Sequence, residues 1–197
     1  MKVLRKSVLL PVAALLVALA GGLYLPHYLL LSTDYRKADA IILLLGPDFS
    51  ARQKEAHRLI QEGMADYLII SAYDKTYRID RGQTVFLPQQ VLGERSRARN
   101  GRAPGFYEDT HLELIDARIV MDALGLRSAI FVSSPYHMRR IGVMVTREFP
   151  KGNDYYFVPT RFESAPRYFW EMTGADARKI WRESVKIVWF LMYSVWL

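Results

Sequence analysis

The sequence predicts a three-layer α/β domain with a mostly parallel sheet, preceded by one N-terminal transmembrane helix. After residue 34, short apolar runs alternate with helical patterns, and each run ends at a glycine, serine or proline. Continuous apolar runs are typical of strands buried on both faces, and strand–helix repeats of this length favour parallel strands with right-handed crossovers. We therefore expect a basic cytoplasmic end over 1–7, a membrane anchor over 8–31 and the α/β domain over 34–197.

The predicted anchor contains no Asp, Glu, Lys or Arg between Val8 and Leu31. As a helix this segment would be ~36 Å long, enough to cross a hydrocarbon core of ~30 Å. Lys2, Arg5 and Lys6 precede the segment, and cations resist translocation, so we expect them in the cytoplasm. The segment therefore predicts a single-pass protein of the plasma membrane with its domain outside the cytoplasm.

A cleaved signal peptide is the alternative interpretation of this segment. Ala18-Leu19-Ala20 has the small-x-small pattern that a signal peptidase accepts. The apolar run continues past Ala20 to Leu31, however, and cleavage would leave that stretch exposed. This continuation favours a retained anchor.

The composition restricts the chemistry. The chain has no cysteine, which excludes disulfides and thiolate zinc sites. Its formal charge is +7, and without the three cations before the anchor 24 Lys and Arg face 20 Asp and Glu. This modest excess suits an anionic small molecule or a lipid headgroup, and it is too small to indicate nucleic acid.

The first strand and helix of the domain are predicted from residues 41–63. The apolar run 41–45 ends at Gly46, as a buried strand would. Ser50 and Gln53 have the spacing of a capping box, which predicts the start of a helix, and Gly63 is a natural end for it.

The second strand is predicted over 67–71, and the pattern of the polar segment 72–106 leaves its structure open. Thr110 and Glu113 have the spacing of a second capping box, and Gly125 predicts the end of that helix. The expected inward face of this helix consists of Leu112, Ile115, Ile119 and Ala123.

The last elements follow the same alternation. Residues 129–132 predict a third strand, residues 138–145 a helix, and residues 155–158 a fourth strand. A long helix is expected from Ala175 onward, and its apolar end is too short to span a bilayer. That helix either packs on the sheet, which we favour, or lies against the bilayer with its tryptophans at the interface.

The strongest candidate site directly follows the third strand. Ligands in such folds bind beyond the carboxyl ends of the strands, where Ser133 and Ser134 offer hydroxyls. His137 and Arg140 lie three residues apart, and hence on one face of the next helix. Arg140 could bind an anion bidentately, and His137 could act as a general acid or base. The structural alternative is a serine cap with Arg140 paired to a surface carboxylate.

Two further clusters lie at strand ends or helix starts. Glu108 and Asp109 could supply a base or an oxygen ligand, although acids also favour the first turn of a helix for electrostatic reasons alone. Gly46 permits close approach of the backbone to a ligand, and Arg52 lies early in the following helix. Neither cluster specifies a metal or a cofactor, and the turn lacks the glycines of a dinucleotide or phosphate-loop motif.

We expect the loops that bear these residues to meet at one edge of the sheet and to form an electropositive hollow. The candidate catalytic residues are His137 and Glu108. The candidate ligand-binding residues are Gly46, Ser50, Arg52, Ser71, Asp109, Thr110, Ser133, Ser134 and Arg140.

Residues 131–140, with the sequence FVSSPYHMRR, resemble a motif of the YdcF-like family of unknown function, which includes the SanA and ElyC envelope proteins. In this resemblance the family's His and Arg correspond to His137 and Arg140. Residues 39–46 are similar to the family's opening block, and Asp109-Thr110 stands where the family usually has Asn-Thr. The glycine-rich turn of the family is reduced here to Gly46-Pro47-Asp48.

The resemblance implies a Rossmann-like, periplasm-facing domain on the bacterial inner membrane, linked to maintenance of peptidoglycan precursors and of the envelope barrier. It brings no settled reaction. One hypothesis is a hydrolase or transferase that acts on a phosphorylated or lipid-linked metabolite, in which His137 and Glu108 move protons. The other is a ligand-binding or regulatory module of the wall machinery without catalysis.

Overall fold

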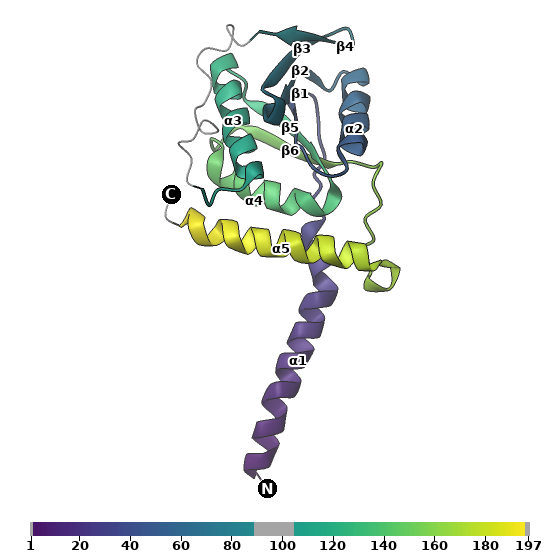
Figure 1. Cartoon of the computed structure of the whole chain (residues 1–197), viewed down its shortest axis with the longest axis vertical. Coiled ribbons are helices and arrows are strands. Elements are labelled where there is room, and N and C mark those ends of the chain that lie inside the picture. The colour runs from purple at the N-terminus through teal and green to yellow at the C-terminus, as the bar shows by residue number, and fades with distance from the viewer. Residues whose placement is uncertain (1, 89–104, 196–197) are drawn as a thin grey trace.

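The computed structural model describes residues 2–88 and 105–195 and shows an α/β domain from which one long helix projects (Figure 1). Its sheet has six strands in the order β4-β3-β2-β1-β5-β6. The four strands that were predicted from apolar runs are parallel to one another. They are β1 (Ala38–Leu43), β2 (Ala65–Ile70), β5 (Ser128–Ser133) and β6 (Asp154–Pro159). The prediction of an α/β fold with a mostly parallel sheet is confirmed.

Two antiparallel strands, β3 (Lys75–Asp80) and β4 (Gln83–Leu87), extend the sheet beyond β2. They lie in the segment 72–106, whose structure the sequence pattern left open. The hairpin turns at Arg81 and Gly82, both with positive φ, as a two-residue turn between twisted strands requires.

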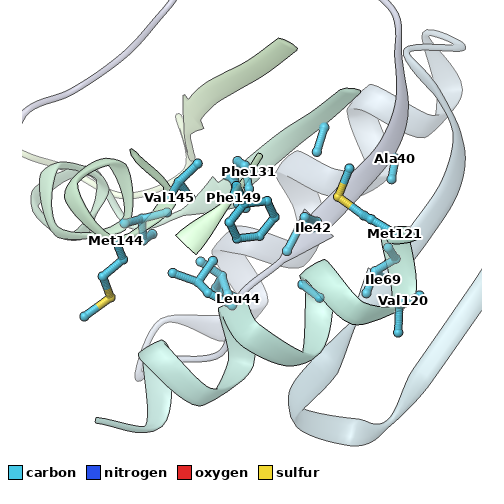
Figure 2. Close-up of a cluster of buried hydrophobic side chains, with 14 of the residues drawn as sticks. Ala40, Ile42, Leu44, Ile69, Val120, Met121, Phe131, Met144, Val145 and Phe149 are labelled. Carbon is cyan, nitrogen blue, oxygen red and sulfur yellow. The ribbon is translucent and has the colours of Figure 1, made fainter. Parts of the chain in front are cut away.

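Helices cover both faces of the sheet. α2 (Phe49–Gln61) packs on one face, while α3 (Asp109–Leu124) and α4 (Met138–Glu148) pack on the other (Figure 1). Successive residues of β1 alternate between these layers: Ile41 belongs to the cluster under α2, and Ile42 to the cluster under α3 and α4. Figure 2 shows the second cluster, in which side chains from strands and from α3 and α4 meet.

The helix starts differ from the prediction, although the ends at Gly63 and Gly125 are confirmed by their positive φ. Asp48 and Glu108 occupy the N-cap positions of α2 and α3 without a side-chain capping bond, so both predicted capping boxes are wrong. The predicted inward face of α3 is also wrong. The buried apolar residues of α3 are instead Leu114, Ala117, Val120 and Met121.

α1 (Lys2–Leu29) contains most of the predicted anchor segment and projects away from the domain (Figure 1). Only its end packs on the domain, where the buried Leu29 clusters with Tyr136, Ile180 and Ile187. Within the described part of the chain, no helix combines the length and the apolar character that crossing a membrane requires.

α5 (Gly174–Ser194) runs across the end of the domain from which α1 projects (Figure 1). Thr173 and Asp176 form a capping box at its start, with both reciprocal hydrogen bonds present. Ile187 and Phe190 are buried, so one face of α5 packs on the domain, but it does so mainly against α1 and α4 and not on the sheet as predicted.

Candidate functional site

The candidate site lies at the carboxyl ends of β1 and β5, which are neighbours in the sheet. From β1 the chain passes through α2 to β2 on one side, whereas β5 lies on the other side of β1. The connections that leave β1 and β5 therefore diverge, and a crevice at such a point is the usual ligand site of an open α/β sheet.

Two cavities occupy this edge and share the lining residues Pro47, His137, Arg182 and Glu183. The larger cavity, of about 580 Å³, lies between the start of α3 and α5. The smaller cavity, of about 190 Å³, lies beside the turn after β1. Because they adjoin at these shared residues, we treat the two together and call them the edge cavity.

Arg52 extends beneath the turn that follows β1 and is almost fully buried. Its Nη1 donates to the carbonyl oxygens of Leu44, at 3.0 Å, and Leu45, and its Nε donates to Ser134 Oγ at 3.1 Å. Burial lowers the pKa of Arg52, and nearby carboxylates oppose that shift. Arg52 thus links the turns after β1 and β5 through its Nη1 and Nε.

Gly46 makes this position of Arg52 possible. A Cβ atom at residue 46 would lie 2.5 Å from the Cζ of Arg52 and 2.6 Å from its Nη1. Gly46 therefore permits a close approach to the backbone, as the sequence predicted. The group that approaches is the guanidinium of Arg52 and not a ligand.

Arg140 lies among Glu108, His137 and Glu183 and is also almost fully buried. Its Nη1 donates to Glu108 Oε2 at 2.6 Å, and its Nε donates to Glu183 Oε2 at 2.8 Å. Burial raises the pKa of Glu108, and Arg140 opposes that shift. The two carboxylates hold the guanidinium from two sides, because neither could be buried stably without a cation.

His137 lies between a carboxylate and a hydroxyl. Its Nδ1 is 3.4 Å from Glu183 Oε2, and its Nε2 is 3.5 Å from Thr110 Oγ1. Nη2 of Arg140 lies 3.1 Å from both ring nitrogens. In the ring plane the lone pairs of the two nitrogens point in diverging directions, so a single donor cannot lie along both. The contact with Arg140 therefore leaves the in-plane direction of Nδ1 to Glu183 and that of Nε2 to Thr110.

Burial and the charge of Arg140 lower the pKa of His137 to about 4, although Glu183 opposes this shift. The pKa of Glu183 is lowered because His137 and Arg140 outweigh the effect of its burial. At neutral pH the carboxylate is thus ionised and the imidazole neutral. The favoured tautomer has Nδ1–H facing Glu183 and an unprotonated Nε2 facing Thr110.

The edge cavity is not electropositive, contrary to our expectation. The larger cavity is lined by the cations Arg140, Arg182 and Lys186 and by the carboxylates Glu108, Asp109, Glu113 and Glu183. In the smaller cavity Lys179 contacts Asp48 at 3.3 Å and Glu163 at 2.8 Å. Among the described residues, Arg182 has no ion-pair or hydrogen-bond partner, which leaves its guanidinium available to an incoming anion.

The structure brings most of the predicted site residues together. His137, Glu108 and Arg140 line the edge cavity, as do Gly46, Arg52, Asp109, Thr110 and Ser134.

Three predicted residues lie elsewhere. Ser50 is exposed on α2 and lines a different depression with Gln53 and His57. Ser71 and Ser133 are buried, and neither lines the edge cavity. Their hydroxyls have no hydrogen-bond partner within the described ranges.

Sequence reasoning missed the contribution of α5, which supplies Lys179, Arg182, Glu183 and Lys186 to the cavity. The signal was the spacing of these charges, since Lys179 and Glu183, and Arg182 and Lys186, lie four residues apart and so share one side of the helix. In the residues that the structure covers, no group of three or more His, Asp or Glu side chains is placed to hold a metal ion.

Comparison of the chain with models of protein families, with curated proteins and with solved structures finds no match. The resemblance to the YdcF-like family therefore stays a prediction from the residues that carry it.

Proposed function

We propose that this chain is an envelope enzyme that binds a phosphorylated or otherwise anionic metabolite in the edge cavity and acts on it as a hydrolase or transferase. The observation that supports this most is the carboxylate–imidazole–hydroxyl arrangement of Glu183, His137 and Thr110. In this order a carboxylate orients a histidine, and the histidine can take a proton from a hydroxyl or from a water.

In this proposal His137 acts as a general base through Nε2. Its distance of 3.5 Å from Thr110 Oγ1 is at the limit of a hydrogen bond, and such contacts commonly shorten when a substrate binds. Depending on the substrate, the proton comes from Thr110 or from a water, whose oxygen attacks phosphorus or a carbonyl carbon. The bond from that atom to its leaving group breaks, and the imidazolium gives the proton to the leaving group. Glu183 then stabilises the imidazolium that forms.

Arg182 is the proposed contact for the anionic group of the substrate. It is exposed, lines both parts of the edge cavity, and has no partner among the described side chains. Arg140 and Arg52 already donate to protein acceptors, so their proposed role is to hold the cavity and its charges in place.

A ligand-binding module without catalysis is the alternative. It is favoured by the balance of charges in the cavity and by the low pKa of His137, since a base with a pKa of about 4 is weak near neutral pH. An anionic ligand would partly neutralise the neighbouring guanidinium groups. This would raise the pKa of His137 toward neutral pH, where a general base is effective.

The proposed location is the outer face of a bacterial inner membrane, with α1 as the anchor. This rests on the apolar sequence of 8–31, on the envelope family that the chain resembles, and on exposed apolar side chains of α1 such as Leu16, Leu19 and Leu23. The anchor would confine the domain near lipid carriers.

The proposed reaction is tested by incubating the full chain in detergent with lipid-linked and nucleotide-linked envelope precursors, with and without divalent cations, and detecting products by mass spectrometry. We expect product from the wild type and none from His137→Ala. His57→Ala is the matched control, because His57 is exposed on α2 and outside the edge cavity. Bound precursor without product in any condition would select the ligand-binding alternative, and equal turnover by His137→Ala would exclude the catalytic role of His137.

A further inference from the structure

α5 carries a second apolar face that no other part of the described chain covers. Its buried apolar residues, Ile180, Ile187, Phe190 and Tyr193, face the domain. The exposed face contains apolar residues that follow one another at helical spacing and so form one stripe. These are Trp181, Val185, Val188, Met192 and Val195.

The exposure of this stripe is large for side chains of this kind. Trp181 is 68% exposed, Met192 59% and Val195 71%. Charged or polar residues normally occupy the outer face of a surface helix, and a contiguous exposed apolar stripe marks an interaction surface.

A second group of exposed aromatic side chains lies in the loop just before α5. Tyr168, Phe169 and Trp170 are exposed, and the rings of Tyr168 and Trp170 stack with centroids 4.7 Å apart. Tyr168 also contacts His27 of α1 edge to face, at 5.5 Å between ring centroids. The aromatic loop, α5 and the end of α1 thus form one continuous region of the molecule.

The arrangement of the helices indicates what this region contacts. α1 projects from the end of the domain across which α5 lies, and α5 is transverse to α1 (Figure 1). Because the domain covers the inner face of α5, its exposed stripe is directed to the side from which α1 leaves. If α1 is the anchor, as proposed above, α5 lies parallel to the bilayer surface.

We propose that the exposed face of α5, together with residues 168–170, lies in the headgroup region of the outer leaflet. Tryptophan and tyrosine favour this interface, and amphipathic helices with arginine at their margins bind anionic headgroups. Arg178 and Arg182 are exposed on α5 and supply that charge. Since Arg182 and Glu183 also line the edge cavity, the docked helix brings the cavity to the level of the headgroups, where the ligand is the phosphate of a lipid or of a lipid-linked metabolite.

Tryptophan fluorescence in nanodiscs that contain brominated lipids tests the proposal. The full chain keeps Trp181 as its one tryptophan, with Trp170, Trp189 and Trp196 changed to Phe, and circular dichroism confirms that it is folded. The nanodiscs contain phosphatidylglycerol and phosphatidylethanolamine brominated either near the carbonyl or near the methyl end of the acyl chain. We expect Trp181 to lose most of its emission with the shallow bromines and less with the deep ones.

A second reporter separates this inference from the proposed anchor. Leu16→Trp, in a chain whose four native tryptophans are Phe, places the probe in α1. Quenching of the L16W reporter without quenching of Trp181 would overturn the inference and leave the anchor in place. Absence of quenching at both positions would overturn both.

A second copy of the chain is the competing occupant of the stripe. In that case the emission of Trp181 would shift to shorter wavelength with rising protein concentration and would not respond to bromination, which would also overturn the inference. Val185→Glu with Val188→Glu changes only exposed positions on α5. We expect this variant to remain folded and to lose the quenching of Trp181 by shallow bromines.

Discussion

Gly46→Ala should destabilise the domain, although the same change at an unconstrained site is neutral or favourable. The added Cβ would lie 2.5 Å from the Cζ of Arg52, so the guanidinium must leave its position. It would then lose its bonds to the carbonyl oxygens of Leu44 and Leu45 and to Ser134 Oγ. Hydrogen bonds to charged groups contribute about 1.5–3 kcal/mol each, and disruption of a buried charged cluster costs about 3–5 kcal/mol.

We therefore expect Gly46→Ala to lower the free energy of unfolding by about 3–5 kcal/mol. The measurement is urea unfolding of the full chain in detergent, followed by near-ultraviolet circular dichroism. Gly174→Ala is the matched control, because a Cβ there meets no atom within 4 Å and the backbone needs no positive φ. This control should change stability by less than about 1 kcal/mol.

A double-mutant cycle isolates the cause of this loss. If the clash with the guanidinium is responsible, Gly46→Ala should have little further effect in an Arg52→Ala background, because the obstructing group is gone. A loss of several kcal/mol in both backgrounds would refute the interpretation that Gly46 exists to admit Arg52.

Two further predictions concern the buried charges of the site. An unfolded histidine titrates near pH 6.5, whereas burial and Arg140 lower the pKa of His137 to about 4 in the folded chain. The unfolded chain alone takes up this proton, so stability should fall as the pH falls from 6.5 toward 4, and His137→Gln should flatten that dependence in urea unfolding; equal slopes would contradict the assignment. Arg140→Met should lower the free energy of unfolding by about 3–5 kcal/mol at pH 7, because Glu108 and Glu183 lose their buried cation. Thermal unfolding at pH 7 and 5 checks this. The loss should be smaller at pH 5, because burial raises the pKa of Glu108 and a lower pH favours the form without the unpaired charge; an undiminished loss would count against this role of Arg140.

The central parallel strands β1 and β5 were predictable because both are buried on their two faces and therefore appear as unbroken apolar runs, such as 129–132. The clustering of Gly46 and His137 followed from the same topology, since parallel strands bring the turns after their carboxyl ends to one edge. Fold and location of the site were thus accessible from local sequence.

The other features of the fold and of the site depend on tertiary contacts, which local sequence patterns do not reveal. The inward face of α3 was misjudged because apolar residues lie all around this helix, so that periodicity does not select Leu114 and Ala117 over Leu112 and Ile115. Glu183 is more than forty residues from His137 in sequence, and only the packing of α5 brings them together. The prediction of an electropositive hollow was wrong for the same reason, because the carboxylates that balance its cations come from several elements.

The proposed role of His137 is to move a proton for a phosphorylated ligand held in the edge cavity. Its most direct measurement follows one envelope precursor by mass spectrometry, both bound to the full chain and as released product, for the wild type and for His137→Ala. We expect both proteins to retain bound precursor and only the wild type to release product. Release at the same rate from both proteins, or no bound precursor on either, would contradict it.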